Sequence, residues 1–148
     1  MDMPAVSAND VAAYILKQHG PMTAMKLQKL LYYCQAWSLV WDEKKLFREK
    51  IEAWVNGPVV PKIYDQHRGK LNLTKWEGGN PEALDEDQKD TVQGVLNFYG
   101  GKTAQWLSDL SHKERPWLDA RKGLSERDRG SAEITLASME EYYSSVPT

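Results

Sequence analysis

Residues 22–37 read MTAMKLQKLLYYCQAW and form the most informative stretch of this 148-residue chain. Apolar side chains recur there every three or four residues, which is the spacing of one face of an α-helix. They are Leu27, Leu30, Leu31, Cys34 and Trp37. Thr23 is placed to cap the first turn, and we expect the helix to run to residue 40 or 41. The pattern therefore predicts a long helix whose wide apolar face packs on a core.

The rest of the chain is predicted to form shorter helices that begin at recognisable caps. Ser7 and Asp85 are each followed three residues later by a capping-box partner, Asp10 and Gln88. The Gly20-Pro21 pair is expected to end the first of these helices. Further helices are predicted at residues 62–67, from Thr103, at 116–121 and at about 135–145.

A small β-hairpin is predicted near residues 46–60. Ile51–Val55 favours an extended segment, and Asn56-Gly57-Pro58 is a turn signal, because Gly accepts a positive φ and Pro fixes its own φ. Residues 68–84 and 121–130 are predicted to be irregular connections. The expected fold class is mainly α, a compact single-domain helical bundle over residues 1–148 with this one hairpin.

Composition excludes several classes of protein. The formal net charge of −2 gives no long-range attraction to phosphate backbones. A single cysteine excludes an internal disulfide and fits a cytoplasmic protein. The first residues lack the pattern of a secretion signal, and no apolar run reaches the roughly 20 residues that would span a bilayer. We expect a cytoplasmic protein that does not interact with membranes.

The motifs of common catalytic and metal sites do not occur in the sequence. His19, His67 and His112 are far apart, without HExxH or paired cysteines, so neither a metal nor another cofactor is predicted. Cys34 lies on an apolar helix face, where a thiol is expected to be inert. We predict no catalytic residues and no enzymatic activity. A small enzyme with a polar pocket around His112 and Glu114 is the weakest alternative.

A nucleic-acid-binding regulator is the stronger alternative. The first two helices, joined by Gly-Pro, allow a helix-turn-helix in which the second would be the recognition helix. That helix would offer a modest polar set: Lys26, Gln28, Lys29 and Gln35. A second small basic group follows it: Lys62, His67, Arg68 and Lys70. The negative net charge argues against this function.

Three blocks in order carry a resemblance to a known family: MKLQKLLYYCQAW at 25–37, IEAWVNGPVVPKIY at 51–64 and LSHKERPW at 110–117. In combination they resemble the Panacea domain of SocA-like antitoxins, found in bacterial toxin–antitoxin loci and prophages. The resemblance covers residues 10–121, and a weaker similarity is found in the last helix. Ser38 and Asn56 depart mildly from the family pattern.

The resemblance implies an antitoxin that neutralises a cognate toxin by direct protein–protein contact. Some relatives act as adaptors that deliver the toxin to an ATP-dependent protease, and the family supplies no catalytic residue or cofactor. The candidate contact residues are Trp54, Asn56, Gly57, Tyr64, His112 and Trp117. For these residues a purely structural interpretation is also open. Trp54 and Gly57 would shape a turn, while Trp117 would lie in the core and His112 would bind a free helix carbonyl.

Overall fold

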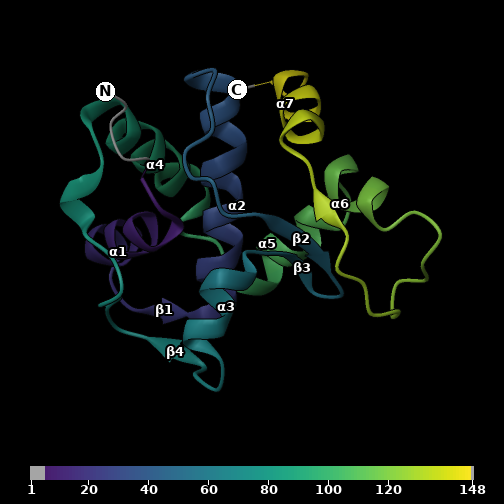
Figure 1. Cartoon of the computed structure of the whole chain (residues 1–148), viewed down its shortest axis with the longest axis horizontal. Coiled ribbons are helices and arrows are strands. Elements are labelled where there is room, and N and C mark those ends of the chain that lie inside the picture. The colour runs from purple at the N-terminus through teal and green to yellow at the C-terminus, as the bar shows by residue number, and fades with distance from the viewer. Residues whose placement is uncertain (1–5, 148) are drawn as a thin grey trace.

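Helix α2 (Ala24–Trp41) lies at the centre of the fold, and the other elements pack around it (Figure 1). The structure is a computed structural model that describes residues 6–147. In Figure 1, α1 and α4 lie on one side of α2, and α6 and α7 lie on the other. The elements besides α2 are α1 (Ala8–His19), β1 (Met22–Thr23), β2 (Ile51–Trp54), β3 (Gly57–Val59), α3 (Pro61–His67), β4 (Asn72–Leu73), the 3₁₀ turn η1 (Pro81–Ala83), α4 (Glu86–Tyr99), α5 (Ala104–Ser111), α6 (Arg115–Ala120), β5 (Glu133–Ile134) and α7 (Leu136–Ser144). The expected mainly helical fold is confirmed.

The predicted helix starts are confirmed by their caps. Ser7 and Asp85 each close a capping box, with Asp10 and Gln88 as partners. Three threonines each accept a hydrogen bond from the backbone N–H three residues on: Thr23, Thr103 and Thr135. These side chains satisfy N–H groups that a helix leaves free in its first turn. The helix predicted at 62–67 begins one residue earlier, with Pro61 in its first turn.

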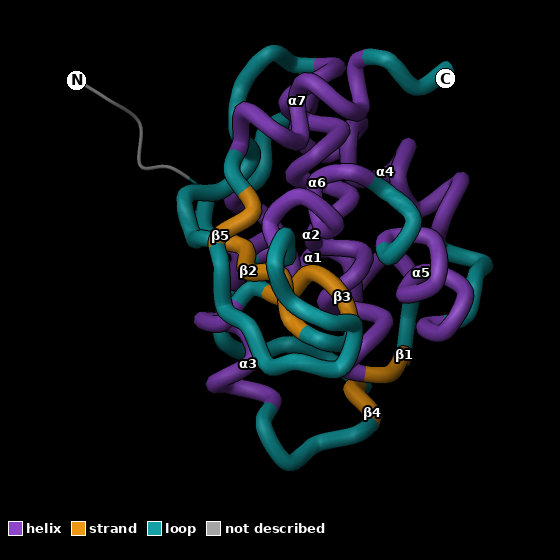
Figure 2. The backbone as a smooth tube through the Cα atoms, turned by 90° about the vertical axis from the view of Figure 1, so that its right-hand side faces the viewer, coloured by secondary structure: helices purple, strands orange, loops and turns teal. Residues whose placement is uncertain are grey.

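The predicted hairpin is present, and it belongs to a three-stranded sheet. Strands β2 and β3 pair antiparallel, with Trp54 opposite Gly57. Strand β5, from the far end of the chain, adds to the other edge of β2, so the strand order is β3-β2-β5 (Figure 2). A second pair, β1 with β4, was not predicted either. Strands of two residues are too short to show an alternating pattern in the sequence.

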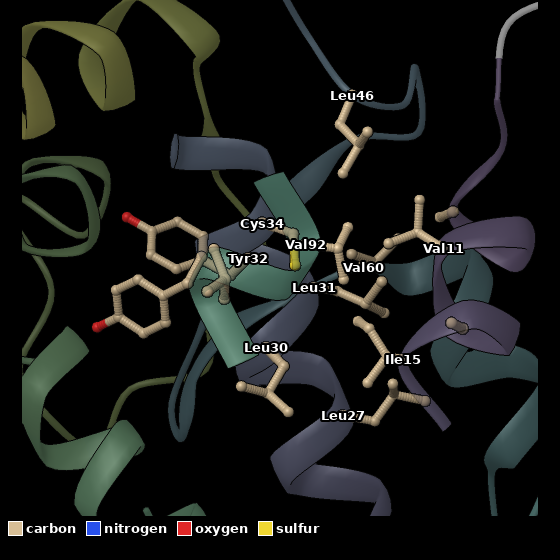
Figure 3. Packing of buried hydrophobic residues seen from close by; sticks show 14 of the residues in the cluster. Val11, Ile15, Leu27, Leu30, Leu31, Tyr32, Cys34, Leu46, Val60 and Val92 are labelled. Carbon is tan, nitrogen blue, oxygen red and sulfur yellow. The ribbon is translucent and has the colours of Figure 1, made fainter. Parts of the chain in front are cut away.

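The apolar core fills the spaces on both sides of α2. Val11 and Ile15 of α1 point toward Leu27 and Leu31 of α2, and all four are fully buried (Figure 3). Cys34 is also buried, and desolvation raises the pKa of its thiol, as expected for an inert cysteine. Within the described part of the chain, the helices are too short or too polar to traverse a lipid bilayer.

Most polar side chains of α2 are buried as well, which argues against the alternative in which α2 is a recognition helix. Gln28, Lys29 and Gln35 are almost completely inaccessible, so they cannot be the surface of a recognition helix. Each polar side chain instead binds backbone carbonyls of the segments around α2. The acceptors are Val60 O for Gln28, Pro58 O for Lys29, Phe47 O for Gln35 and Lys44 O for Ser38.

Gln35 gives the first testable prediction, because its amide pairs backbone groups of Leu46 and Phe47, two residues that belong to no strand. Its Oε1 accepts the N–H groups of Leu46 and Phe47, at 2.7 and 3.3 Å, and its Nε2 donates to Phe47 O at 2.6 Å. We expect Gln35→Leu to lower the free energy of unfolding by about 2–4 kcal/mol, since it leaves buried backbone groups unpaired. Urea denaturation measures this. The exposed Gln105→Leu is the control, and an equal effect in both variants would contradict the assignment.

Candidate functional site

A groove of about 1100 Å³ opens between the first half of α2, the β2–β3 hairpin and α3. These three elements are neighbours in both views (Figures 1 and 2), and residues 129–131 line one side. Much of the lining is apolar or aromatic. These residues are Ala24, Met25, Trp54, Val55, Val59, Tyr64 and Leu71. The groove is the candidate functional site because it combines partly exposed aromatic side chains with charged ones.

The charged side chains that line the groove are all cationic. They are Lys29, Arg68, Lys70 and Arg129, with His67 as a further titratable group. Neither aspartate nor glutamate belongs to the lining. In the part of the chain that the structure describes, none of these cations forms an ion pair. The formal charge of the lining is therefore positive, although the net charge of the chain is negative.

Lys29 is the most unusual of these residues, because only 1% of its surface is exposed. Its Nζ donates to Pro58 O at 3.1 Å, and no carboxylate stabilises its charge. Desolvation lowers the pKa of the ammonium to about 7, which is the direction expected for a buried lysine. The groove is thus lined by a buried cation whose only hydrogen-bond partner in residues 6–147 is a neutral carbonyl.

Gln28 fixes the state of the neighbouring histidine. Its Oε1 accepts Val60 N–H at 2.8 Å, and this orients its Nε2 toward His67 Nε2 at 2.9 Å. Because an amide nitrogen only donates, the ring nitrogen accepts, which requires a neutral His67. Burial, reinforced by the nearby Lys29 charge, lowers the pKa of His67 and favours the same state. At neutral pH the groove therefore has a neutral imidazole beside a partly charged lysine.

Two aromatic side chains stand in edge-to-face contact at the groove. The ring centroids of Trp54 and Tyr64 are 4.9 Å apart at an interplanar angle of 69°. Trp54 Nε1 donates to Glu52 Oε1 at 2.9 Å, and Trp54 O accepts from Trp117 Nε1 at 2.8 Å. The indole of Trp54 is therefore held by Glu52, and the backbone of the same residue is held by Trp117.

The structure brings only part of the predicted contact set together. Trp54, Asn56 and Tyr64 line the groove, whereas His112 and Trp117 do not. Trp117 is buried, with 4% of its surface exposed, so it supports Trp54 from behind instead of facing a partner. Its indole stacks on the His112 ring at 4.1 Å. The expectation that His112 binds a helix carbonyl is wrong for Nε2, which is buried without a partner.

Gly57 completes the predicted set by making room for Lys29. Its φ of +120° is one that other residues avoid, and a Cβ there would lie 2.7 Å from Lys29 Cε and 3.1 Å from Ser111 Oγ. We expect Gly57→Ala to destabilise the protein by about 1–3 kcal/mol. Gly101→Ala is the matched control, because it has open space and no positive φ. Thermal unfolding of both variants tests this, and equal melting temperatures would contradict it.

The other groove residues have only partial signals in the sequence. His67, Arg68 and Lys70 belong to the small basic group noted in the sequence, but nothing there placed them opposite Lys29. Arg129 comes from a segment predicted only to be a loop. Its approach to the hairpin follows from the pairing of β5 with β2, which the sequence did not indicate.

Glu114, the residue considered with His112 for a catalytic pocket, belongs to a separate buried network. Its Oε1 accepts hydrogen bonds from the hydroxyls of Tyr33 and Tyr143, both at 2.7 Å. Burial raises the pKa of Glu114. The network joins α7 to α2 and does not line the groove. Across residues 6–147, no cluster of three or more His, Cys, Asp or Glu side chains is arranged to hold a metal ion.

Comparisons with known proteins agree with the resemblance carried by the three sequence blocks. Neither a curated protein nor a solved structure matches the chain. A family model described as "Antitoxin SocA-like, Panacea domain" matches residues 27–118. This match runs from the first turn of α2 to α6, includes every groove element except the 129–131 segment, and covers more than half of the chain. The chain therefore belongs to the SocA-like antitoxin family, and its core is a Panacea domain.

Proposed function

We propose that this chain neutralises a cognate toxin by binding it directly, without catalysis, and that the groove beside α2 is the contact surface. Membership of an antitoxin family supports the role. The observation that carries the choice of surface is the pair of preoriented aromatic rings, Trp54 and Tyr64, set among unpaired cations. Tryptophan, tyrosine and arginine dominate the energy of protein interfaces. The complex would form in the cytoplasm.

Neutralisation would work by covering the toxin's active site or its binding site for a target. An interface of ordinary size, about 800 Å² on each partner, would extend beyond the groove itself. Trp54 and Tyr64 are suited to be anchors because packing and hydrogen bonds already restrict them, so little conformational entropy is lost on binding. Trp117 and His112 would act as positioning residues that hold Trp54 and the hairpin.

Co-expression with the protein encoded by the adjoining reading frame tests this function. We expect the neighbour to arrest growth alone, and the wild-type chain to restore growth and co-purify with it. Trp54→Ala should weaken the complex about 30-fold or more, as expected for an interface anchor. Trp106→Ala is the matched control, because Trp106 is exposed on α5 outside the groove.

Three outcomes would contradict the proposal. Growth arrest that the wild-type chain does not relieve would remove the antitoxin role. If Trp54→Ala binds the toxin with unchanged affinity, the contact surface lies outside the groove. Loss of the toxin only in cells that contain an ATP-dependent protease, with no inhibition by the purified chain, would favour an adaptor over direct neutralisation.

A further inference from the structure

We propose that the groove receives an extended acidic segment of the toxin and that Lys29 forms an ion pair with one carboxylate of that segment. The inference rests on the proposed function and names the chemistry of the partner. Three observations carry it: the missing counter-charge of Lys29, the absence of carboxylates from the groove, and the apolar walls between the cations.

The first step concerns Lys29 itself. Burying a cation without an anionic partner costs several kcal/mol, so such groups are rare in proteins unless they are paired. An ammonium has three N–H donors, and Pro58 O is the single acceptor recorded for Lys29 among the described residues. A carboxylate that enters the groove would supply the missing charge and use a free donor. Relief of the desolvation cost would then favour binding.

The second step concerns the other cations. Arg68, Lys70 and Arg129 are exposed and unpaired, and they line the same groove as Lys29. The groove therefore gathers several cations in one lining, and none of them has a carboxylate of the described residues within ion-pair distance. Such a field attracts acidic segments and repels basic ones.

The third step distinguishes a peptide from a nucleic acid. The cations alternate with apolar surface, since Met25 and Leu71 are exposed and lie on the same groove. A peptide with acidic and apolar side chains satisfies both kinds of contact. A phosphate backbone would need a continuous row of surface cations, whereas Lys29 is recessed and the chain as a whole is negative. The groove therefore favours an acidic polypeptide.

The test measures the affinity of the purified chain for the purified toxin by calorimetry at 50 and 300 mM NaCl. Lys29→Met should weaken binding about 30-fold or more while the variant stays folded. Arg68→Glu with Lys70→Glu should weaken binding at least tenfold and reduce its salt dependence. The matched control is Lys113→Glu with Lys122→Glu, two exposed lysines outside the groove, which should change the affinity less than twofold.

Overlapping peptides from the toxin then identify the bound segment. We expect the binding peptides to be rich in aspartate or glutamate and to lose affinity for Lys29→Met. Binding confined to neutral or basic peptides would overturn the inference. A fluorescent 20-nucleotide single strand tests the other ligand type: if it binds wild type, competes with the toxin and fails to bind the same variants, the groove binds a nucleic acid and the inference is wrong.

Failure of the inference can be told apart from failure of the proposed function. If no complex forms with wild type, both are wrong. If the complex forms and Trp54→Ala weakens it, but Lys29→Met and the Arg68/Lys70 variant bind as wild type does, the groove still binds the toxin and only the acidic segment is excluded.

Discussion

Lys29→Met is expected to raise the free energy of unfolding at pH 7 by about 2 kcal/mol, an unusual gain for a buried substitution. The fall of the Lys29 pKa from 10.5 to about 7 corresponds to a cost of about 4 kcal/mol for holding the amine in the core at that pH. Methionine has a similar shape and no charge. Pro58 O loses its hydrogen-bond donor in this variant, which offsets part of the gain in the free energy of unfolding.

The pH dependence of stability gives the same prediction a distinctive signature. Between pH 7 and pH 10.5 the unfolded chain holds the Lys29 proton while the folded chain releases it, so the contribution of Lys29 to stability rises with pH. The slope of this contribution approaches about 1.4 kcal/mol per pH unit. Buried acids oppose it: the unfolded Cys34 thiol ionises from about pH 8.5 and the unfolded tyrosines from about pH 10, whereas burial raises the pKa values of Cys34, Tyr32, Tyr33 and Tyr143 in the folded chain.

The difference in unfolding free energy between wild type and Lys29→Met, measured by urea denaturation between pH 7.5 and 9.5, isolates the contribution of Lys29. We expect wild type to gain stability relative to Lys29→Met across this window, while Lys29→Met itself loses stability toward pH 9.5, because the unfolded Cys34 thiol ionises and the buried one does not. Lys113→Met is the control and should keep the wild-type slope, because Lys113 is exposed. A difference that does not change with pH, or a destabilised Lys29→Met, would show that the amine is hydrated or paired.

Tyr143→Ala is expected to lower the free energy of unfolding by about 3–5 kcal/mol, the range for removing a large aromatic side chain from a core. Tyr143 is 1% exposed and, together with Met139, forms the buried face of α7. Its hydroxyl donates to Glu114 Oε1 and lies 2.9 Å from the Tyr32 hydroxyl. Its ring also packs against Trp37 at 5.6 Å.

Two comparisons divide this effect into packing and hydrogen bonding. Tyr143→Phe keeps the ring and should cost about 1–2 kcal/mol, because Glu114 loses one of its two tyrosine donors. Glu140→Ala, an exposed position on the same helix, should be nearly neutral. Hydrogen exchange should show α7 losing protection in Tyr143→Ala. Full protection of α7 in that variant would mean that other contacts hold the helix.

The elements that the sequence predicted are those whose signals are local. Ser7 and Asp85 carry their capping partners within four residues, and Asn56-Gly57-Pro58 contains the whole turn of the hairpin. The pairing of β5 with β2 joins residues about eighty positions apart. Neither strand encodes that partner in its own composition, so the pairing could not be predicted.

The same distinction between local and long-range signals explains which residues of the candidate site could be predicted. Trp54, Asn56 and Tyr64 were predicted together and lie together, because one hairpin and the helix after it carry all three. The sequence places Lys29 only among the polar residues that a recognition helix would offer. Its burial depends on the hairpin that packs over α2, a tertiary contact. The sequence leaves Trp117 open as an anchor or a core residue, and the structure places it in the core.

The titration of Lys29 by NMR, followed at its labelled ε-carbon, tests most directly whether this amine is the receptor for a carboxylate. In the free protein we expect a pKa of about 7. In the complex with the toxin we expect the pKa to rise by two units or more, because an anionic partner stabilises the charged form. A Lys29 pKa near 10.4 in the free protein would contradict the burial of an unpaired ammonium. A value that stays at about 7 in the complex would show that the toxin brings no carboxylate to Lys29.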